Sequence, residues 1–556
     1  MNFMTGKLPH GDPAAADPAT PRRRLSDLVI GVVSGISGGS ATIMLDIAAM
    51  ESLAGHADPS VAMAGQVGSQ VKMRMGQAWL VATVRTLALA PKGTHVVAEI
   101  DFIGEGDQEQ LTGRIFRFRR GVTRFPLPGT HIFPVSNADM IEIYSAHDQA
   151  RIEIGTVYPT ATTRASLLVD ALLGKHFALL GSTGTGKSTS AALILHRICD
   201  MAPQGHVVMI DPHGEYGAAF ATNGAVYNAA NLELPYWLMN FEEHCEVIVT
   251  SKGPERAMDC DILAKCLLAA RARNRAAEGI GRLTVDSPIP YLLSDLTTIL
   301  QNEMGKLDKS TNTLPYLRLR TRLDEIKADP RFSFMFSGML VADSMQAFLS
   351  KIFRLPAQGK PISIIDTSAM PSEITHVVVS VLSRLIFDFA IWARDEEQKP
   401  ILLVCEEAHR YIPASNAGEG QSVRKILERI AKEGRKYGVS LGLITQRPSD
   451  LAEGVLSQCG TIIAMRLNNE RDQHFVKAAM PEGSRGFLDA IPALRNRECV
   501  VCGEGVSVPI RVAFDDLEAE RRPASADPVF SALWRQSGGE EEILERTVNR
   551  WRNQGR

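Results

Sequence analysis

The chain lacks an excess of charge of either sign. Its 556 residues include 60 lysines and arginines and 63 aspartates and glutamates, which gives a net charge of −3. That balance argues against a protein that binds nucleic acid over its whole surface, although it allows a local basic channel. With 45% hydrophobic and 22% charged residues, the composition is that of a globular protein with a sizeable core. The length predicts about three structural units.

The sequence also lacks the usual marks of metal sites, secretion and membrane insertion. Cys499 and Cys502 have CxxC spacing, but no second pair or nearby histidine accompanies them, so we expect buried thiols. Residues 1–21 contain no apolar segment of the kind found in signal peptides. The most hydrophobic predicted helix, residues 376–392, contains Arg384 and Asp388 and is too short to span a bilayer. We therefore expect a cytoplasmic protein without membrane contact.

A phosphate-binding motif lies in the middle of the chain. Residues 177–189 read FALLGSTGTGKST, which is a short apolar strand, a Gly-x-x-x-x-Gly-Lys-Ser loop and the start of a helix expected over residues 190–199. This is the P-loop pattern in its strand–loop–helix context, and the context disfavours a glycine-rich turn that binds nothing. Backbone N–H groups and the helix N-terminus can surround phosphate oxygens. The expected nucleotide-binding residues are Gly181, Ser182, Thr183, Gly184, Thr185, Gly186, Lys187, Ser188 and Thr189.

Within this motif, Lys187 can reach the β- and γ-phosphates of ATP, and the Ser188 hydroxyl can ligate Mg²⁺. Short apolar runs elsewhere predict a parallel sheet around the P-loop strand, buried on both faces. Functional polar residues belong at the carboxyl ends of such strands, where Asp211, Glu406, Glu407 and Gln446 fall. The predicted strands cover residues 207–211, 362–366, 401–406, 441–445 and 461–467.

Two adjacent carboxylates end the strand at residues 401–406. ATP hydrolysis requires an acid that holds the Mg²⁺ shell and a base that orients the attacking water. Neighbouring positions at a strand end point to opposite sides, so we assign Glu406 to Mg²⁺, through water, and Glu407 to the attacking water. Gln446, at the end of the next strand, can hydrogen-bond both the γ-phosphate and this water. The plainer alternatives are surface acids at a strand exit and an ordinary polar loop residue.

An amphipathic helix with a basic face follows the two carboxylates. Its apolar residues recur at helical spacing, and basic residues occupy the other positions. Such a face is usually only solvated. In a ring, however, one of its arginines can reach the γ-phosphate of the neighbouring subunit, and Arg435 is our first choice and Arg429 the second. The apolar set is Val423, Ile426, Leu427, Ile430 and Ala431, and the basic set is Arg424, Arg429, Lys432, Arg435 and Lys436.

The remaining segments differ in character. Strand-forming runs between residues 27 and 150 predict a small barrel or sandwich, and Phe116 and Phe118 alternate with arginines as in a half-buried strand. Helical patterns at residues 257–277 and 314–327 predict an α-helical insertion. We expect its arginines to lie on a solvated surface, with nucleic-acid contact as the alternative. These arginines are Arg271, Arg273, Arg275, Arg318, Arg320 and Arg322.

Four motifs in this order resemble the HerA ATPases of the HerA/FtsK group. They are DPHGEY at residues 211–216, CEEAHRY at 405–411, EGRKYG at 433–438 and TQRP at 445–448. The resemblance extends from the strand-rich N-terminal part to about residue 514. It implies an α/β fold with a RecA-like P-loop core and an N-terminal β-barrel. The expected domains are a disordered tail (1–26), the barrel (27–150), the core (151–231 and 356–520), the helical insertion (232–355) and a C-terminal tail (521–556).

The resemblance also implies a function. Members of this family form hexameric rings that hydrolyse ATP between subunits and move double-stranded DNA through a central channel. A nuclease docks on the barrel side, and bacterial relatives act with nuclease or sirtuin-like effectors in DNA repair or anti-phage defence. Lys187 and Ser188 match the family's nucleotide-binding pair, Glu407 its catalytic acid and Gln446 its sensor. Lys175 lies where the family carries a basic residue that acts across the subunit interface, and Asp211 belongs to the nucleotide site.

Two other functions are compatible with the same motifs. A motor that moves polypeptide, as secretion ATPases do, would use the same chemistry, but the order of barrel and then core argues against it. A ring that holds an effector, with nucleotide binding controlling assembly, would need ATP binding without turnover. Glu407→Gln separates this scaffold from a motor, because a scaffold would keep its function in that variant.

Overall fold

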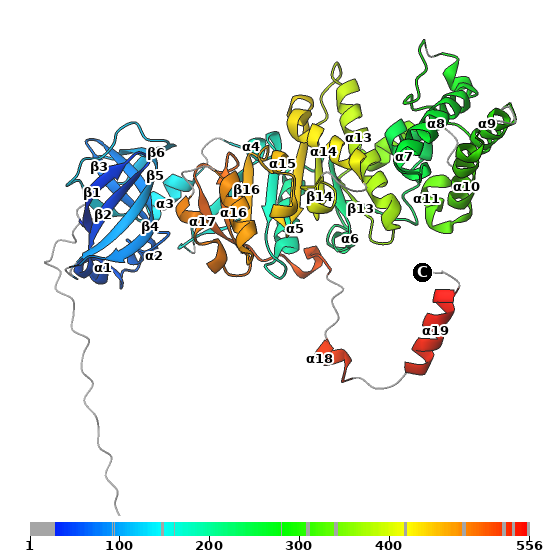
Figure 1. The fold of residues 1–556 in the computed structure, drawn as a ribbon. Coiled ribbons are helices and arrows are strands. Elements are labelled where there is room, and N and C mark those ends of the chain that lie inside the picture. The colour runs from blue at the N-terminus through cyan, green and yellow to red at the C-terminus, as the bar shows by residue number, and fades with distance from the viewer. Residues whose placement is uncertain are drawn as a thin grey trace, which may run out of the picture.

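The computed structural model describes residues 28–552 except 92, 94, 146–148, 161, 280, 307–311, 338–342, 416–419, 481–484, 525–529 and 536–539. The chain forms an elongated molecule, with a β-barrel at one end, a sheet domain in the middle and a helical region at the other end (Figure 1). The predicted fold class is confirmed in these three parts. The exact domain limits remain predictions, and the tail predicted for residues 1–26 lies outside the described residues.

The barrel is a closed antiparallel sheet. Its strands follow the order β2-β1-β7-β3-β4-β5, and pairing of β2 with the first half of β5 closes the ring, while β6 pairs with the second half of β5. Closure removes the exposed sheet edges that would otherwise invite association. The elements are β1 (Gly31–Ser37), β2 (Ser40–Asp46), α1 (Ile47–Leu53), α2 (Pro59–Ala62), β3 (Gln70–Met75), β4 (Ala78–Leu89), β5 (His95–Gln108), β6 (Ile115–Arg120), β7 (His131–Pro134) and α3 (Asn137–Tyr144).

The half-buried pattern predicted for Phe116 and Phe118 is wrong for Phe116, whereas Phe118 is half-buried and packs against a hydrophobic core. The side chain of Phe116 is 49% exposed, and only Ile115 in β6 is fully buried. A register shift on β5 between Glu105 and Asp107 and the left-handed backbone of Arg117, with φ of 52°, break the two-residue alternation. A bulge of this kind redirects the following side chains, which a period of two cannot anticipate.

The central domain is an 11-stranded mixed sheet with the P-loop strand β10 in its interior. The part that runs β12-β13-β11-β14-β15-β10-β16 is parallel, and β17, β18, β8 and β9 extend it with antiparallel pairings. The strands are β8 (Arg151–Val157), β9 (Arg164–Leu168), β10 (Phe177–Leu180), β11 (Val207–Asp211), β12 (Gly224–Tyr227), β13 (Ile362–Asp366), β14 (Ile401–Glu406), β15 (Val439–Thr445), β16 (Thr461–Met465), β17 (Glu498–Gly503) and β18 (Ile510–Phe514).

The two faces of this sheet belong to different hydrophobic cores. Phe177 and Leu179 pack with α5 and the barrel side, whereas Ala178 and Leu180 pack with α13, α14 and the helical region. Alternate residues of a strand point to opposite faces, so each parallel strand needs an unbroken apolar run. Cys499 and Cys502 are both buried, but they fall into different cores. The helices are α4 (Val169–Gly174), α5 (Lys187–Met201), α6 (Tyr216–Ala219), α13 (Ser372–Trp392), α14 (Gln421–Glu433), α15 (Glu453–Leu456), α16 (Glu470–Ala479) and α17 (Arg485–Leu488).

The helical region interrupts the sheet between β12 and β13. Most of its predicted surface arginines form ion pairs there, such as Arg318 with Asp259 at 2.9 Å. The expectation of a solvated surface is wrong for Arg271, which is fully buried and donates to the carbonyl oxygens of Met239 and Trp237 at 3.0 and 3.3 Å. Its helices are α7 (Phe241–Ile248), α8 (Pro254–Ala272), α9 (Leu293–Gly305), α10 (Leu314–Ala328), α11 (Ser333–Phe336) and α12 (Met345–Phe353).

Helix α13 corrects the predicted length of the hydrophobic helix. It has 21 residues and, within the described part of the chain, it is the one helix long and apolar enough to cross a membrane. In this fold 67% of its most hydrophobic window is buried inside the protein. Arg384 of α13 donates to both carboxylate oxygens of the fully buried Glu243 in α7, at 2.9 and 3.1 Å. The helix therefore serves as the core helix that joins the sheet to the helical region.

The C-terminal segment first packs beside the P-loop helix and then leaves the body of the molecule. The backbone oxygen of Arg521 lies 3.2 Å from His196 Nε2 in α5, and Ala524 N donates to Glu215 O at 2.9 Å. Beyond this point, α18 (Phe530–Leu533) and α19 (Glu540–Arg552) stand apart from the three main parts (Figure 1). Apolar side chains on both helices are exposed, including Phe530 and Leu544.

Candidate active site

The P-loop has the backbone shape that phosphate binding requires. Gly184 and Gly186 have φ of 78° and 92°, a region in which a side chain would be strained. Helix α5 begins at Lys187, directly after Gly186, so its N-terminal N–H groups and partial positive charge face the loop. Thr185 Oγ1 donates to Ser182 O at 2.7 Å and closes the loop from inside. These features suit the β- and γ-phosphates of a nucleotide.

Space behind the loop is tight. A Cβ atom on Gly181 would lie 2.9 Å from Met465 Cβ of β16, and one on Gly186 would lie 2.8 Å from Arg497 Cγ. Arg497 N donates to Thr185 O at 2.8 Å, and its side chain pairs with Asp516. Arg497 therefore supports the P-loop from the loop before β17. Its sequence context carries no motif, and no signal in the sequence identifies it.

Three neighbouring strand ends bring the predicted catalytic residues together. Lys187 Nζ lies 3.2 Å from Glu407 Oε1, and both side chains are more than 90% buried. Thr183 Oγ1 of the P-loop hydrogen-bonds Gln446 Oε1 at the end of β15. Strand β15 lies between β10 and β14, so the sheet order itself places Gln446 between the P-loop and the two carboxylates. The P-loop, Glu407 and Gln446 thus converge as the sequence predicts.

The two adjacent glutamates have different surroundings. Glu406 Oε1 accepts a hydrogen bond from Tyr216 OH at 3.1 Å, and Glu407 adopts a left-handed backbone with φ of 49°. A left-handed glutamate is strained, and such strain is often found at functional sites. The second carboxylate oxygens, Glu406 Oε2 and Glu407 Oε2, are buried and accept no hydrogen bond of normal geometry from the residues that the structure describes, although His409 Nδ1 lies 3.2 Å from Glu407 Oε2. Buried oxygens of this kind are suited to accept from a water molecule or a metal-bound water.

The Glu406 side chain carries an unusual protonation equilibrium. Burial, and next the nearby charge of Asp211, raise the pKa of Glu406 to about 8, against the opposing effect of Lys187. Asp211 itself has a raised pKa, mainly because it is buried. Both oxygens of Asp211 accept backbone N–H groups of the following turn, from Gly214 and Tyr216 at 2.9 Å and from His213 at 3.1 Å. Asp211 therefore holds the turn that presents Tyr216 to Glu406, and its direct role in nucleotide binding stays a prediction.

The residues fit a Mg²⁺ ion next to the P-loop. The Ser188 hydroxyl supplies a hard oxygen ligand at the start of α5, and Glu406 Oε2 is a buried carboxylate oxygen with no partner among the described residues. Mg²⁺ binds one or two such oxygens and keeps several waters. The fit supports Ser188 as a direct ligand and Glu406 as a ligand through water, which is the assignment predicted from the sequence.

Glu406 makes stability depend on pH. Its pKa is raised from an ordinary 4.5 to about 8, so the stability linked to its proton is complete below about pH 4.5 and is lost as the pH rises through about 8. Between about pH 6 and about pH 9, the free energy of unfolding of the unmodified protein should fall by about 2–3 kcal/mol more than that of the Glu406→Gln variant. Urea denaturation at several pH values, with chelator and no nucleotide, measures this difference. Equal slopes for the two proteins would contradict a buried, protonated Glu406.

Lys175, Arg429 and Arg435 do not join this cluster. Lys175 precedes β10, so it lies at the amino ends of the parallel strands, and the P-loop lies at their carboxyl ends. Lys175 pairs with Glu504. Arg435 precedes β15 at the same amino ends of the strands, where it lines a cavity of about 530 Å³. A strand rises about 3.3 Å per residue, so the four residues of β10 alone separate its two ends by about 13 Å. Neither side chain can therefore act on the P-loop of its own subunit, and a role across an interface stays a prediction.

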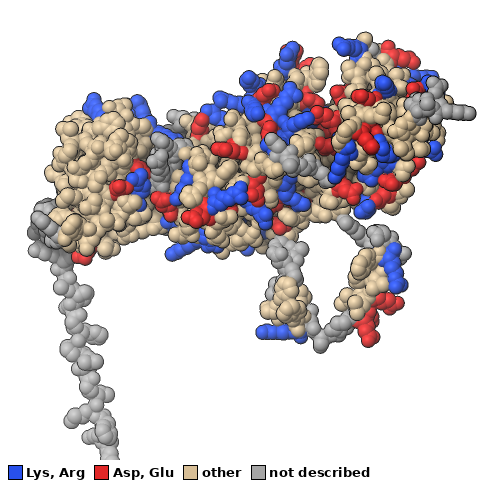
Figure 2. Space-filling view, viewed as in Figure 1, with Lys and Arg blue, Asp and Glu red and all other residues tan. Residues whose placement is uncertain are grey.

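The two candidate arginines differ in their freedom. Arg429 Nε lies 3.4 Å from Glu433 Oε2, and its guanidinium lies 4.8 Å from the centre of the Phe387 ring. Arg435 is exposed and makes no ion pair within the described ranges of the chain. Lysines and arginines gather over the part of the surface formed by α13 and α14 (Figure 2). Arg435 is thus the better placed of the two to reach a neighbouring molecule.

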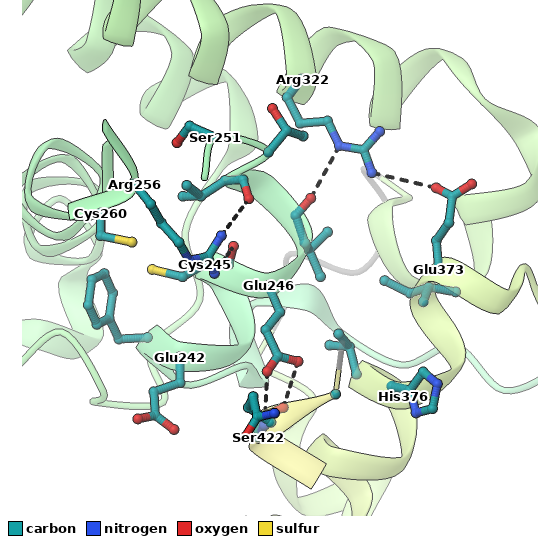
Figure 3. Close-up of a pocket in the computed structure, with 18 of the residues that line it drawn as sticks. Glu242, Cys245, Glu246, Ser251, Arg256, Cys260, Arg322, Glu373, His376 and Ser422 are labelled. Atoms are coloured by element: carbon teal, nitrogen blue, oxygen red, sulfur yellow. Dashed lines mark hydrogen bonds and ion pairs between the residues drawn. The ribbon is translucent and has the colours of Figure 1, made fainter. Parts of the chain in front are cut away.

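A separate cavity of about 720 Å³ lies between the helical region and α14 (Figure 3), and its lining residues include none from the P-loop. Glu246 of α7 accepts hydrogen bonds from Ser422 N and Ser422 Oγ at 2.8 Å, and so caps the N-terminus of α14. Gly420 and Gln421, at the start of α14, line this cavity. Residues 416–419 lie outside the described residues.

A P-loop, paired strand-end carboxylates and a strand-end glutamine on one parallel sheet define a P-loop ATPase. The family model described as "Helicase HerA, central domain" matches residues 152–386. The chain is 27% identical over 490 residues to the DNA double-strand break repair helicase HerA of Pyrococcus furiosus, covering 81% of this chain and 84% of that protein. It is 25% identical to the probable HerA of Methanocaldococcus jannaschii, over 76% and 87% of the two chains.

The chain is thus a nucleotide-binding P-loop ATPase that is similar to HerA helicases over most of its length, as the four motifs suggest. Among solved structures, VirB4 of Thermoanaerobacter pseudethanolicus is similar, with a TM-score of 0.48 and 17% identity, over 68% of this chain and 100% of that one.

Proposed function

We propose that this protein is a ring-forming, ATP-driven motor that moves double-stranded DNA. The observation that carries the proposal is the convergence of Lys187, Glu407 and Gln446 from three neighbouring strand ends in a chain of HerA type. The names of its relatives, which are DNA double-strand break repair helicases, support DNA as the substrate. The order of barrel and then ATPase core is the same as in the family that the motifs resemble.

Each residue of the site has a distinct task in this proposal. The P-loop N–H groups and Lys187 bind the β- and γ-phosphates, and Ser188 with Glu406 would hold Mg²⁺, which neutralises phosphate charge. Lys187 contacts Glu407 in this structure, and the γ-phosphate competes for the same ammonium group. The Glu407 carboxylate, whose Oε2 atom accepts no hydrogen bond of normal geometry from the described residues, then orients the attacking water and receives its proton. Gln446 binds this water and the γ-phosphate through its amide.

Within one subunit, neither Arg429 of α14 nor Arg435 of the turn after it lies in the P-loop cluster. We place Arg435 of a neighbouring copy at the γ-phosphate, with Arg429 as the second choice, and Lys175 at the same interface. A closed ring, as a hexamer, gives every P-loop such a neighbour. The ring would enclose the DNA channel, and a nuclease or sirtuin-like effector would dock on the barrel side. We place this machine in the cytoplasm, in DNA end processing or anti-phage defence.

Linear duplex DNA should stimulate ATP turnover by the purified protein. Contacts to the phosphate backbone are independent of sequence, so unrelated duplexes should stimulate equally, and the apparent affinity should fall steeply as salt is raised. Steady-state ATPase assays with and without DNA, at about 50 and about 200 mM salt, measure both effects. Casein, an unfolded polypeptide, is the matched alternative substrate. Stimulation by polypeptide and none by DNA, with or without the partner, would contradict a DNA motor.

A further inference from the structure

A histidine lies against the proposed catalytic glutamate and has no assigned role. His409 follows β14 in a short 3₁₀ turn, Ala408–Arg410, and its side chain is 16% exposed. Its Nδ1 atom lies 3.2 Å from Glu407 Oε2 and 2.9 Å from Thr445 Oγ1. Thr445 is the last residue of β15 and directly precedes Gln446. One imidazole nitrogen therefore lies between the strand end that bears Glu407 and the strand end that bears Gln446.

The chemistry of these three groups defines which of them can donate. A carboxylate only accepts hydrogen bonds, so a contact from Nδ1 to Glu407 requires that Nδ1 carries the hydrogen. Thr445 Oγ1 also accepts from Arg447 N at 3.0 Å, which ties it to the turn that follows Gln446. Burial lowers the pKa of His409, although Glu407 acts in the opposite direction. In a neutral ring the one hydrogen on Nδ1 donates to Thr445 Oγ1 and is shared, at a longer distance, with Glu407 Oε2.

Lys187 and His409 hold opposite oxygens of the same carboxylate. Lys187 Nζ is close to Glu407 Oε1, and His409 Nδ1 is close to Glu407 Oε2. The P-loop lysine is the group that binds the β- and γ-phosphates during turnover, and its charge is then shared with the nucleotide. Among the residues described, His409 is the polar side chain that stays beside Oε2. The left-handed backbone of Glu407, with φ of 49°, makes an external restraint on this residue more important.

We propose that His409 is a positioning residue that keeps the Glu407 carboxylate turned toward Gln446, through a hydrogen-bonded link to Thr445. This inference rests on the proposed function, because it assumes that Glu407 orients the attacking water. In this arrangement the histidine transfers no proton to the substrate. It couples the rotation of Glu407 to the position of β15, so the base and the sensor move together.

Three substitutions of His409 test the proposal in the full-length protein. His409→Ala should lower kcat for ATP about tenfold to a hundredfold, because a small misplacement of the base is costly, while KM changes by less than about threefold. In His409→Asn the side-chain amide stands near the place of Nδ1 and should restore most of the loss. In His409→Gln the amide reaches toward the place of Nε2 instead, so the loss should remain. His474→Ala, on the exposed side of α16, is the matched control.

The link to Thr445 is tested by a double-mutant cycle. Thr445→Val removes the hydroxyl and keeps the side-chain shape, and should lower kcat as His409→Ala does. If both act through one hydrogen bond, the double variant should be no slower than the slower single variant. Additive losses would overturn the link, and equal kcat values for His409→Ala and the unmodified protein would overturn the positioning role. Melting temperatures within a few degrees of the unmodified protein show that each variant is folded. If His409→Ala is not folded, the kcat values of His409→Asn and His409→Gln decide the positioning role.

Failure of this inference differs from failure of the proposed function. If Glu407→Gln still hydrolyses ATP, Glu407 is not the base and the assigned chemistry is wrong. If Glu407→Gln is inactive and His409→Asn is no better than His409→Gln, only the role of His409 is wrong. A direct titration with a fluorescent ATP analogue completes the comparison, because a positioning residue leaves nucleotide affinity unchanged.

Discussion

Glu407→Gln is expected to lower ATP turnover by about a thousandfold while the protein still binds ATP. The amide cannot accept the proton of the attacking water, but it keeps the size of the carboxylate. The same change removes the ion pair between Glu407 and Lys187, whose nitrogen and oxygen lie 3.2 Å apart. Lys187 is more than 90% buried, and a buried charge that loses its partner is strongly destabilised. The phosphates of ATP replace that partner, so we expect ATP to bind more tightly to the variant than to the unmodified protein.

Single-turnover hydrolysis and equilibrium binding of ATP measure the two effects separately. Glu325→Gln, on the exposed side of α10, makes the same chemical change on the surface and should leave both quantities unchanged. Turnover within about tenfold of the unmodified protein would remove Glu407 from the proposed chemistry. Loss of ATP binding together with turnover would instead assign Glu407 a structural role. A partner effector that still works with the inactive variant would favour the scaffold function.

Arg435→Ala and Lys187→Ala should each abolish ATP turnover, and a mixture of the two variants should recover part of it. In the proposed function Lys187 acts on the nucleotide of its own subunit, whereas Arg435, which precedes β15 at the amino ends of the parallel strands, acts on that of its neighbour. An arginine finger contributes about 10³-fold or more to the rate. If equal amounts of the two variants assemble at random, about a quarter of the interfaces combine an intact Lys187 with an intact Arg435. We therefore expect the mixture to show turnover that neither variant shows alone.

The order of mixing supplies the control for this experiment. Variants mixed after each has formed rings should stay inactive until subunits exchange, whereas joint refolding or long incubation should restore turnover. Arg429→Ala, whose guanidinium already contacts Glu433 and Phe387, should retain most of its activity. An active Arg435→Ala protein would contradict Arg435 as the finger. The finger would be Arg429 if Arg429→Ala is inactive alone and recovers turnover when it is mixed with Lys187→Ala.

Much of the sheet could be predicted because parallel strands buried on both faces need unbroken apolar runs. The runs at residues 207–211, 362–366 and 401–406 are found with the same limits in β11, β13 and β14. The predicted helix at 190–199 is longer in the structure, where α5 extends from Lys187 to Met201. Strands β8, β9 and β12 were not predicted. Strand β8 alternates buried Ile152 and Ile154 with exposed Arg151 and Glu153, so a period of two does mark it.

Some missed features have no local signal. Arg271 is buried because carbonyl groups from residues far along the chain satisfy its guanidinium. His409 and Tyr216 stand within the motifs, but their contacts with Thr445 and Glu406 depend on how three strand ends meet. A sequence pattern records neighbours along the chain, whereas these contacts join residues that are tens to hundreds of positions apart.

By itself, the sequence determined that this chain binds a nucleotide and which strands carry the catalytic groups. Both are local properties: a glycine-rich turn before a helix, and polar residues where apolar strands end. Only the tertiary structure decided that Lys187 faces Glu407 and that Lys175 and Arg435 lie at the opposite ends of the parallel strands. The physical reason is that strand order, which is set by packing of helices on both faces, decides which strand ends are neighbours. Local residue preferences do not contain that order.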